Sequence, residues 1–345
     1  MDTSWKEQIK EYLAAVNQAY VNGKDELAAP FFSAGAASQN ERERLQRAKE
    51  QNQARGVHLL AAKMHAVPLQ IVQIGGNRVE ALIRVHHQLH YMQQDRAFLQ
   101  ELSHVQLVKL MRDGEHWSFL DTWGEFFPAE QAEGQDHHQE DEPDGGREDM
   151  EAGAHAEEAE GEEPDGDATS GPVEVAYAAG GYDRQQAVAY AETYWNSPNP
   201  AFKVFVDDDC TNFISQCLYA GGIPMVYTGS RSQGWWYRGG SNPDWSYSWT
   251  VAHSLYWLLK SGKAPFYATV LSDPAELEPG DVISYDFEGD GRWDHSAIVT
   301  AKDSLGQPLV NAHTNSSRQR YWEYRDSPDY TSNIRYSFFH IYGQA

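Results

Sequence analysis

The sequence predicts an α+β protein, and three observations lead to that fold class. Helical periodicity precedes strand-like alternation in residues 1–128, and the same order recurs in residues 180–345. The segment between them, residues 129–179, has no apolar periodicity. A chain of 345 residues is also too long for one ordinary core. We therefore expect two folded α+β domains that are separated by a linker.

The N-terminal domain is expected to begin with two helices, the second and more charged one from residue 40 to about residue 54. Strand alternation follows, with a turn at residues 75–77 and a second hairpin that closes at Asp113-Gly114. Helices followed by a curved antiparallel sheet resemble the cone-shaped NTF2-like fold, which we expect for residues 1–128. The apolar face of the first helix comprises Trp5, Ile9, Tyr12, Leu13, Val16 and Tyr20.

The net charge of −24 is concentrated in the linker. Residues 130–167 hold 17 acidic side chains and one arginine, so they carry −16 and leave −8 for the rest of the chain. Such a segment cannot bury enough apolar surface to offset its ordering entropy, and we expect it to be disordered. Its charge argues against nucleic acid as a partner of this segment.

Three histidines near one another, His86, His87 and His90, raise the question of a metal site. On a strand His86 and His90 share a face, but the sequence offers no evident third ligand. The segment "DFEGDGRWD", residues 286–294, resembles a fragment of a calcium loop but lacks the full set of oxygen ligands. We interpret it as a hairpin turn at Asp290-Gly291 and expect neither a metal nor a cofactor.

The two cysteines, Cys210 and Cys217, lie on one expected helix, roughly 10 Å apart along its axis. That separation exceeds the reach of a disulfide, which is about 7 Å between Cα atoms. The N-terminus shows no signal-peptide pattern, and no apolar run approaches the roughly 18 residues of a membrane span. Our default expectation is a cytoplasmic protein, with secretion as the alternative if a leader has been removed.

The stretch "FVDDDCTNFISQCLYAGGIP" places a cysteine where a helix is expected to begin. Asp209 or a neighbouring aspartate is expected to cap this helix, and Gly221-Gly222 to end it. Unpaired N–H groups in the first turn favour a low pKa for the thiol of Cys210, as a nucleophile requires. The aspartates oppose this effect, so a nearby imidazolium should compensate. Cys217 is expected to be a buried structural cysteine.

Histidines downstream of the cysteine offer the matching base. His295, in "WDHSAIVT", opens an apolar strand from which it could reach the start of the helix. Asn311 and His313, in "LVNAHTN", share one face of the next expected strand. Either side chain could hold the imidazole in its useful tautomer, as the third member of a catalytic triad does.

Six motifs follow one another in the C-terminal region. They are "YDRQQAVAYAETYW", "DCTNFISQCLYAGG", the Trp-rich loop "GSRSQGWWYRGGSNPDWSYSW", "GDVISYDF", "DHSAIVT" and "AHT". In this order they make residues 182–345 resemble the putative amidase domain family, a branch of the papain-like clan, and "DCTNFIS" is similar to the cysteine motif of NlpC-type cell-wall peptidases. The resemblance implies a papain-like cysteine hydrolase domain with Cys210 as nucleophile and His295 as base. The family's "AHT" motif indicates His313 as the third residue, with Asn311 as the alternative.

We therefore expect a hydrolase that cleaves C–N amide bonds through a thioester on Cys210. Its substrate is expected to be a peptide, a cell-wall fragment or a small amide, recognised by the tryptophans of the aromatic loop. Packing of that loop over the core is the alternative. For the whole protein, the alternative is a papain-like binding or interaction protein without catalysis. The tryptophans expected to bind substrate are Trp235, Trp236 and Trp249.

Overall fold

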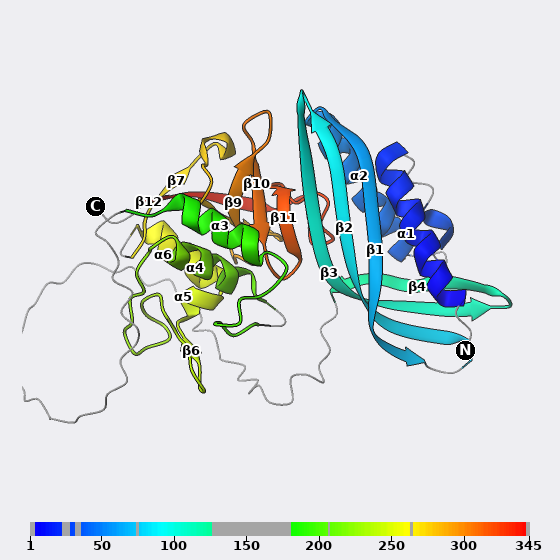
Figure 1. Cartoon of the computed structure of the whole chain (residues 1–345), viewed down its shortest axis with the longest axis horizontal. Coiled ribbons are helices and arrows are strands. Elements are labelled where there is room, and N and C mark those ends of the chain that lie inside the picture. Colours follow the sequence, from blue (N-terminus) through cyan, green and yellow to red (C-terminus); the bar gives the residue numbers. More distant parts are fainter. Residues whose placement is uncertain are drawn as a thin grey trace, which may run out of the picture. The chain divides into compact units, whose positions relative to one another are not determined.

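A computed structural model describes the protein in seven stretches of its chain. They are residues 4–22, 28–31, 36–73, 76–125, 181–205, 208–262 and 265–342. Residues 1–127 and 179–345 form one compact unit (Figure 1). The expected disordered linker, residues 129–179, lies outside the described residues.

Two helices and a short 3₁₀ turn open the chain. Helix α1 (Ser4–Asn22) buries the apolar face that the sequence predicts, against helix α2 (Ala36–Ala54) and the strands that follow. The turn η2 (Ala29–Phe31) lies between them. Helix α2 contributes fewer apolar residues, chiefly Leu45 and Ala48, to the same core. Periodic apolar spacing is therefore sufficient to predict this helical layer.

Four antiparallel strands complete the N-terminal part. They are β1 (Val57–Gln73), β2 (Arg78–Gln93), β3 (Arg96–Asp113) and β4 (His116–Glu125), each paired with the next. The predicted hairpin at Asp113-Gly114 is confirmed, since Asp113 pairs with His116 and Gly114 has a φ of +62°. Helices α1 and α2 cover one face of these strands (Figure 1).

The C-terminal part also begins with helices. They are α3 (Arg184–Tyr194), α4 (Cys210–Ala220), the short α5 (Tyr247–Thr250) and α6 (Ala252–Ser261). Asp183 caps α3 through the N–H of Gln186 at 3.0 Å. Gly221 ends α4 as predicted, and a Cβ there would lie 2.4 Å from the ring of Tyr182. The lack of a side chain therefore lets the segment before α3 pack against the end of α4.

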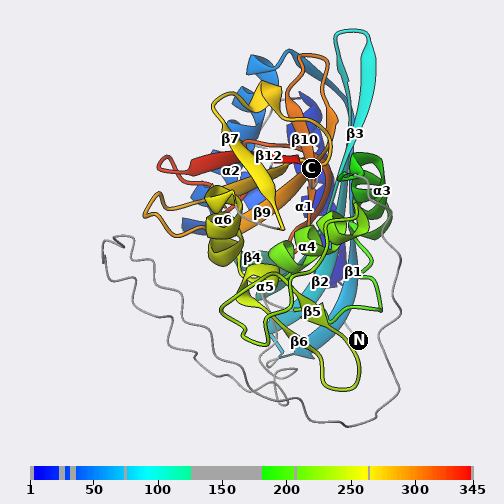
Figure 2. The same cartoon turned by 90° about the vertical axis from the view of Figure 1, so that its left-hand side faces the viewer.

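Six strands of the C-terminal part continue the antiparallel sheet, in the spatial order β11-β10-β9-β8-β12-β7. Two of them, the strand that His295 opens and the strand that follows it, are expected from the sequence. Helices α3, α4 and α6 pack on one face (Figure 2), and an aromatic cluster covers the other. The six strands are β7 (Tyr267–Leu271), β8 (Val282–Asp286), β9 (His295–Lys302), β10 (Pro308–Ala312), β11 (Ser316–Tyr321) and β12 (Arg335–Tyr342). The C-terminal part also contains the 3₁₀ turn η4 (Pro274–Glu276). Two further strands of two residues each, β5 (Tyr237–Arg238) and β6 (Asp244–Trp245), pair with each other.

The two parts of the sheet join where β11 pairs with β3. Three residue pairs form the contact, with Arg318 opposite Glu101, and their side chains make an ion pair at 2.8 Å. The other half of the same edge of β3 pairs with β4. Sequence periodicity did not predict this pairing, so the expected division into two α+β domains describes two segments of one sheet.

No helix in the described part of the chain is long and apolar enough to cross a membrane.

Candidate active site

Cys210 is the first residue of α4, and its side chain is fully buried. The sulfur donates a hydrogen bond to Oδ1 of Asp208 at 3.2 Å and lies 3.5 Å from the hydroxyl of Thr211. The Thr211 hydroxyl in turn lies 3.4 Å from Oγ of Ser296, the residue that follows His295. The chain therefore brings the cysteine at the start of the helix to the first residues of β9.

Asp209 occupies the N-cap position of α4 as predicted, but its carboxylate accepts no backbone N–H of the helix. Its Oδ1 instead accepts from the backbone N–H of Phe205 at 3.0 Å and from the amide of Asn212 at 2.8 Å. Its Oδ2 lies 2.7 Å from Nδ1 of His313. The carboxylate is therefore committed to the loop before α4 and to the end of β10.

The pKa of the Cys210 thiol is raised, not lowered as the sequence suggested. Burial is the largest cause, because it disfavours the charged thiolate, and the carboxylate of Asp208 raises the pKa further. The hydroxyl of Thr211 and the N–H of Ser296 act in the opposite direction but do not outweigh burial. At neutral pH Cys210 is therefore a thiol.

His295 opens β9 and is nearly buried. Its Nε2 lies 3.2 Å from the hydroxyl of Tyr324. Burial lowers the pKa of His295 to about 3, and the positive charge of Arg320 contributes to the decrease. The imidazole is therefore neutral at neutral pH. The expected compensating imidazolium is not found at this position, since both the Cys210 thiol and the His295 imidazole are neutral.

The two candidates for the third catalytic residue have other partners. Asn311 accepts from the hydroxyl of Thr300 at 2.9 Å and donates to Glu192 at 3.0 Å. His313 makes its hydrogen bonds with Asp209 and with the carbonyl of Tyr194, the latter at 2.7 Å. Among the described residues, the side chain that His295 contacts by a hydrogen bond is that of Tyr324. Among the described residues, the expected hydrogen bond from His313 or Asn311 to the His295 imidazole is therefore not found.

A cavity of about 350 Å³ is lined by residues that surround the start of α4, although Cys210 itself is not part of its wall. Asp208 forms part of its wall, and its carboxylate accepts the hydrogen bond of the Cys210 thiol. His295 and Tyr324 also line the cavity. Two more carboxylates, those of Asp294 and Asp329, also line it. The cavity is thus rich in acidic groups, and one of them, Asp208, contacts the buried thiol.

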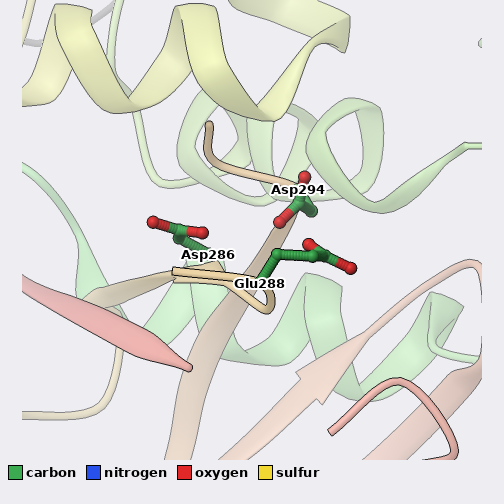
Figure 3. Close-up of side chains that lie close together, drawn as sticks. All are labelled: Asp286, Glu288 and Asp294. Atoms are coloured by element: carbon green, nitrogen blue, oxygen red, sulfur yellow. The ribbon is translucent and has the colours of Figure 1, made fainter. Parts of the chain in front are cut away.

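Three carboxylates lie close together at the loop between β8 and β9 (Figure 3): those of Asp286, Glu288 and Asp294, within 4.8 Å of one another. Asp286 is fully buried and accepts backbone N–H groups of three loop residues, at 2.7, 3.1 and 2.9 Å. Burial raises the pKa of Asp294 to about 6. The predicted hairpin is confirmed, because β8 and β9 pair antiparallel on either side of this loop. Asp286 therefore serves to hold the turn.

The tryptophans expected to bind substrate belong to the core instead. Trp235, Trp236 and Trp249 are all buried. The indole N–H of Trp235 donates to Ser215 at 3.0 Å, and that of Trp249 donates to Asn212 at 2.9 Å, so both are tied to α4. None of the three therefore has an exposed face for a substrate. Trp235 and Trp249 pack the helical layer and support α4, whereas the indole N–H of Trp236 donates to the carbonyl of Gln233 at 3.1 Å.

Sequence reasoning missed several groups around the thiol. Asp208 lies in the aspartate run that drew attention to the motif, but nothing distinguished it from its neighbours. Ser296 directly follows the predicted base, so its backbone N–H could have been considered. Tyr324 lies 114 positions after Cys210, and no local pattern marks it. Asn315, which also lines the cavity, stands two residues after the predicted His313.

The comparisons agree with the motifs. Residues 181–339 match the family model described as "Putative amidase domain". Over 160 residues, 46% of this chain and 50% of the relative, the sequence is 58% identical to the uncharacterized protein YhbB of Bacillus subtilis (strain 168). Over 166 residues, 45% of this chain and 37% of the relative, it is 31% identical to the uncharacterized protein YjcM of the same strain. The matched region thus spans half or less of each curated relative.

Among solved structures, the intermembrane space region of the chloroplast protein ARC6 matches with a TM-score of 0.28 and 9% identity, over 36% of this chain and 95% of that one. A similarity this low carries no argument about fold or function.

Proposed function

We propose that the chain is a cysteine-dependent amidase in which Cys210 attacks an amide carbonyl and His295 carries the proton. The observation that carries the proposal is the contact of the first turn of α4 with Ser296, in which the Thr211 hydroxyl lies 3.5 Å from the Cys210 sulfur and 3.4 Å from Oγ of Ser296. This contact brings the start of α4 to the residue that follows the histidine. The family match at residues 181–339 supports an amidase-like hydrolase.

The reaction starts from a neutral thiol and a neutral imidazole. The S–H bond of Cys210 turns from Asp208 toward His295, which takes the proton as the sulfur bonds to the carbonyl carbon. The low basicity of His295 rises as the negative sulfur forms beside it, because each charge stabilises the other. The N–H groups in the first turn of α4 have no partner within the helix and are suited to stabilise the oxyanion.

Collapse of the tetrahedral intermediate breaks the C–N bond. The leaving amine takes the proton from the imidazolium of His295, and the acyl group remains on Cys210 as a thioester. Water then adds to the thioester and gives a proton to His295. The second collapse releases the carboxylic acid and returns the proton to the sulfur, so that the neutral pair is restored.

The fold assignments belong to the same proposal. A cysteine at the start of a helix, followed by an antiparallel sheet whose β9 begins with His295, supports a papain-like arrangement for residues 180–345. Two helices on one face of a four-stranded antiparallel sheet support an NTF2-like arrangement for residues 1–128. Both are inferences from element order.

Cysteine substitutions test the function directly. With a panel of aminoacyl p-nitroanilides and peptide amides as substrates, Cys210→Ala should abolish hydrolysis while the protein stays folded. Cys217→Ala is the matched control, because it removes the other buried thiol of the same helix. It should leave turnover in place and cost about 1–3 kcal/mol of the free energy of unfolding. Hydrolysis that survives Cys210→Ala and is lost in Cys217→Ala would overturn the assignment.

The second candidate function is a binding protein that has the architecture but no catalysis. The full burial of Cys210 and its raised thiol pKa favour it. Iodoacetamide separates the two functions in the Cys217→Ala protein. An amidase should be alkylated at Cys210 and lose turnover in proportion, whereas a binding protein should show neither alkylation nor turnover.

A further inference from the structure

We propose that Tyr324 is the residue that positions the His295 imidazole, in the role that the sequence suggested for a side chain on β10 or just after it. This inference rests on the proposed function, since it concerns the same base. It assigns a positioning role to a tyrosine that lies outside the six sequence motifs.

The geometry around the imidazole carries the proposal. The Tyr324 hydroxyl lies 3.2 Å from Nε2 of His295 and 3.5 Å from the hydroxyl of Ser317. The ring of Tyr324 is 3% exposed and lies 5.3 Å from the imidazole, centroid to centroid. Ser317 is fully buried. The three side chains therefore form a continuous line of polar atoms inside the protein.

The direction of these hydrogen bonds determines which nitrogen is basic. If Tyr324 gives its proton to Ser317, its oxygen accepts from Nε2–H of His295, and the lone pair is on Nδ1. If Tyr324 gives its proton to Nε2, then Nδ1 carries the hydrogen and has no lone pair to offer. The buried Ser317 hydroxyl provides the acceptor that the first arrangement needs. In that arrangement the base is Nδ1, because Nε2 carries the hydrogen that is donated to Tyr324.

Tyr324 is held in place from several sides. Its φ of +56° is in the left-handed region, which an aromatic residue adopts only when its surroundings compensate. The guanidinium of Arg320 lies 3.9 Å above the centre of its ring, and that arginine is fixed by an ion pair with Asp326 at 2.9 Å. The backbone carbonyl of Tyr324 also accepts from the N–H of Ser327 at 2.8 Å. This supporting structure fixes the position of the hydroxyl group.

A neighbouring tyrosine supplies a matched control. Tyr285 is fully buried, and its ring lies 5.5 Å from the imidazole of His295 and 4.8 Å from the ring of Tyr324. Its hydroxyl has no hydrogen-bond partner in the described part of the protein. Tyr285→Phe and Tyr324→Phe therefore remove the same atom from the same aromatic cluster, but only the second removes a contact with the base.

The test combines nitrogen NMR of ¹⁵N-histidine-labelled full-length protein with steady-state kinetics. The His295 signals are assigned by their loss in His295→Gln. In the wild type the imidazole should be the Nε2–H tautomer. Tyr324→Phe should shift the tautomer population and lower kcat by tenfold or more, with KM changed less than twofold. Tyr285→Phe should leave both the tautomer and kcat as in the wild type.

Ser317→Ala gives a second readout that leaves Tyr324 intact. Without the acceptor, the Tyr324 proton should turn to Nε2, and the tautomer should shift in the same direction. An unchanged His295 tautomer in both variants overturns the positioning role, and so does an equal loss of kcat in Tyr324→Phe and Tyr285→Phe. The tautomer is measured without substrate, so a protein that hydrolyses no amide refutes the proposed function but not the hydrogen-bond arrangement.

Discussion

The Asp209 carboxylate lies 2.7 Å from Nδ1 of His313, and this contact ties the residue before Cys210 to the end of β10. The imidazole is stacked on Phe213 of α4 at 3.9 Å between ring centroids, and its Nε2 lies 2.7 Å from the carbonyl oxygen of Tyr194. Both ring nitrogens therefore face acceptors. We interpret His313 as a group that fixes the start of α4 from the sheet side.

Replacing His313 should therefore act first on stability. His313→Ala removes a buried hydrogen-bond partner of the Asp209 carboxylate, which typically costs about 1–3 kcal/mol. Urea unfolding at pH 7 measures the loss. Asn311→Ala, which removes a buried side chain that contacts neither Asp209 nor Cys210, controls for general damage to this part of the sheet. An unchanged free energy of unfolding in His313→Ala would contradict this interpretation.

Asp208→Asn should lower the pKa of the Cys210 thiol. The Asp208 carboxylate raises that pKa, so the neutral amide removes a negative charge that opposes the thiolate. The rate of iodoacetamide alkylation, measured against pH in the Cys217→Ala background, should rise at lower pH than in the parent. Asp329→Asn, which changes another carboxylate of the same cavity, should leave the profile in place. An unchanged profile in Asp208→Asn would show that the carboxylate does not act on the thiol.

The buried neutral His295 should make stability depend on pH. Its pKa is about 3 in the folded state and about 6.5 when unfolded, so the unfolded chain binds the extra proton. The contribution of neutral His295 to the free energy of unfolding is complete above about pH 6.5 and is lost as the pH falls toward 3. The wild type should therefore lose about 2 kcal/mol more between pH 7 and pH 5 than His295→Gln does. Urea titrations at both pH values measure the difference, and equal losses in the two proteins would contradict it.

Helix α2 should influence the site through the loop that carries Tyr324. Arg47 donates to the backbone carbonyls of Arg325 and Ser327, at 3.0 and 3.2 Å. Arg47→Ala should lower kcat several-fold while the protein remains folded, because the backbone on the C-terminal side of Tyr324 loses two donors. Glu43→Ala, at an exposed position of the same helix, should have no effect. Full activity in Arg47→Ala would show that the loop keeps its position without α2.

Local spacing accounts for what the sequence alone could predict. The buried face of α1, the hairpin at Asp113-Gly114, the start of α4 at Cys210 and the strand that opens with His295 each follow from residues close together in the chain. The order of the motifs also agrees with the family model that matches residues 181–339. Helical and strand periods and turn residues operate over a few positions, so they can be recognised without a structure.

Burial and distant pairing determined the rest. The pairing of β3 with β11, the contact between His295 and Tyr324, and the raised thiol pKa of Cys210 all depend on groups brought together by the fold. The sequence places the candidate triad partners near the end of β10, because that strand follows His295 in the chain. The imidazole instead contacts Tyr324, in the loop that follows β11. The charge state of a thiol depends on how much water and which charges surround it, and those are properties of the packed molecule.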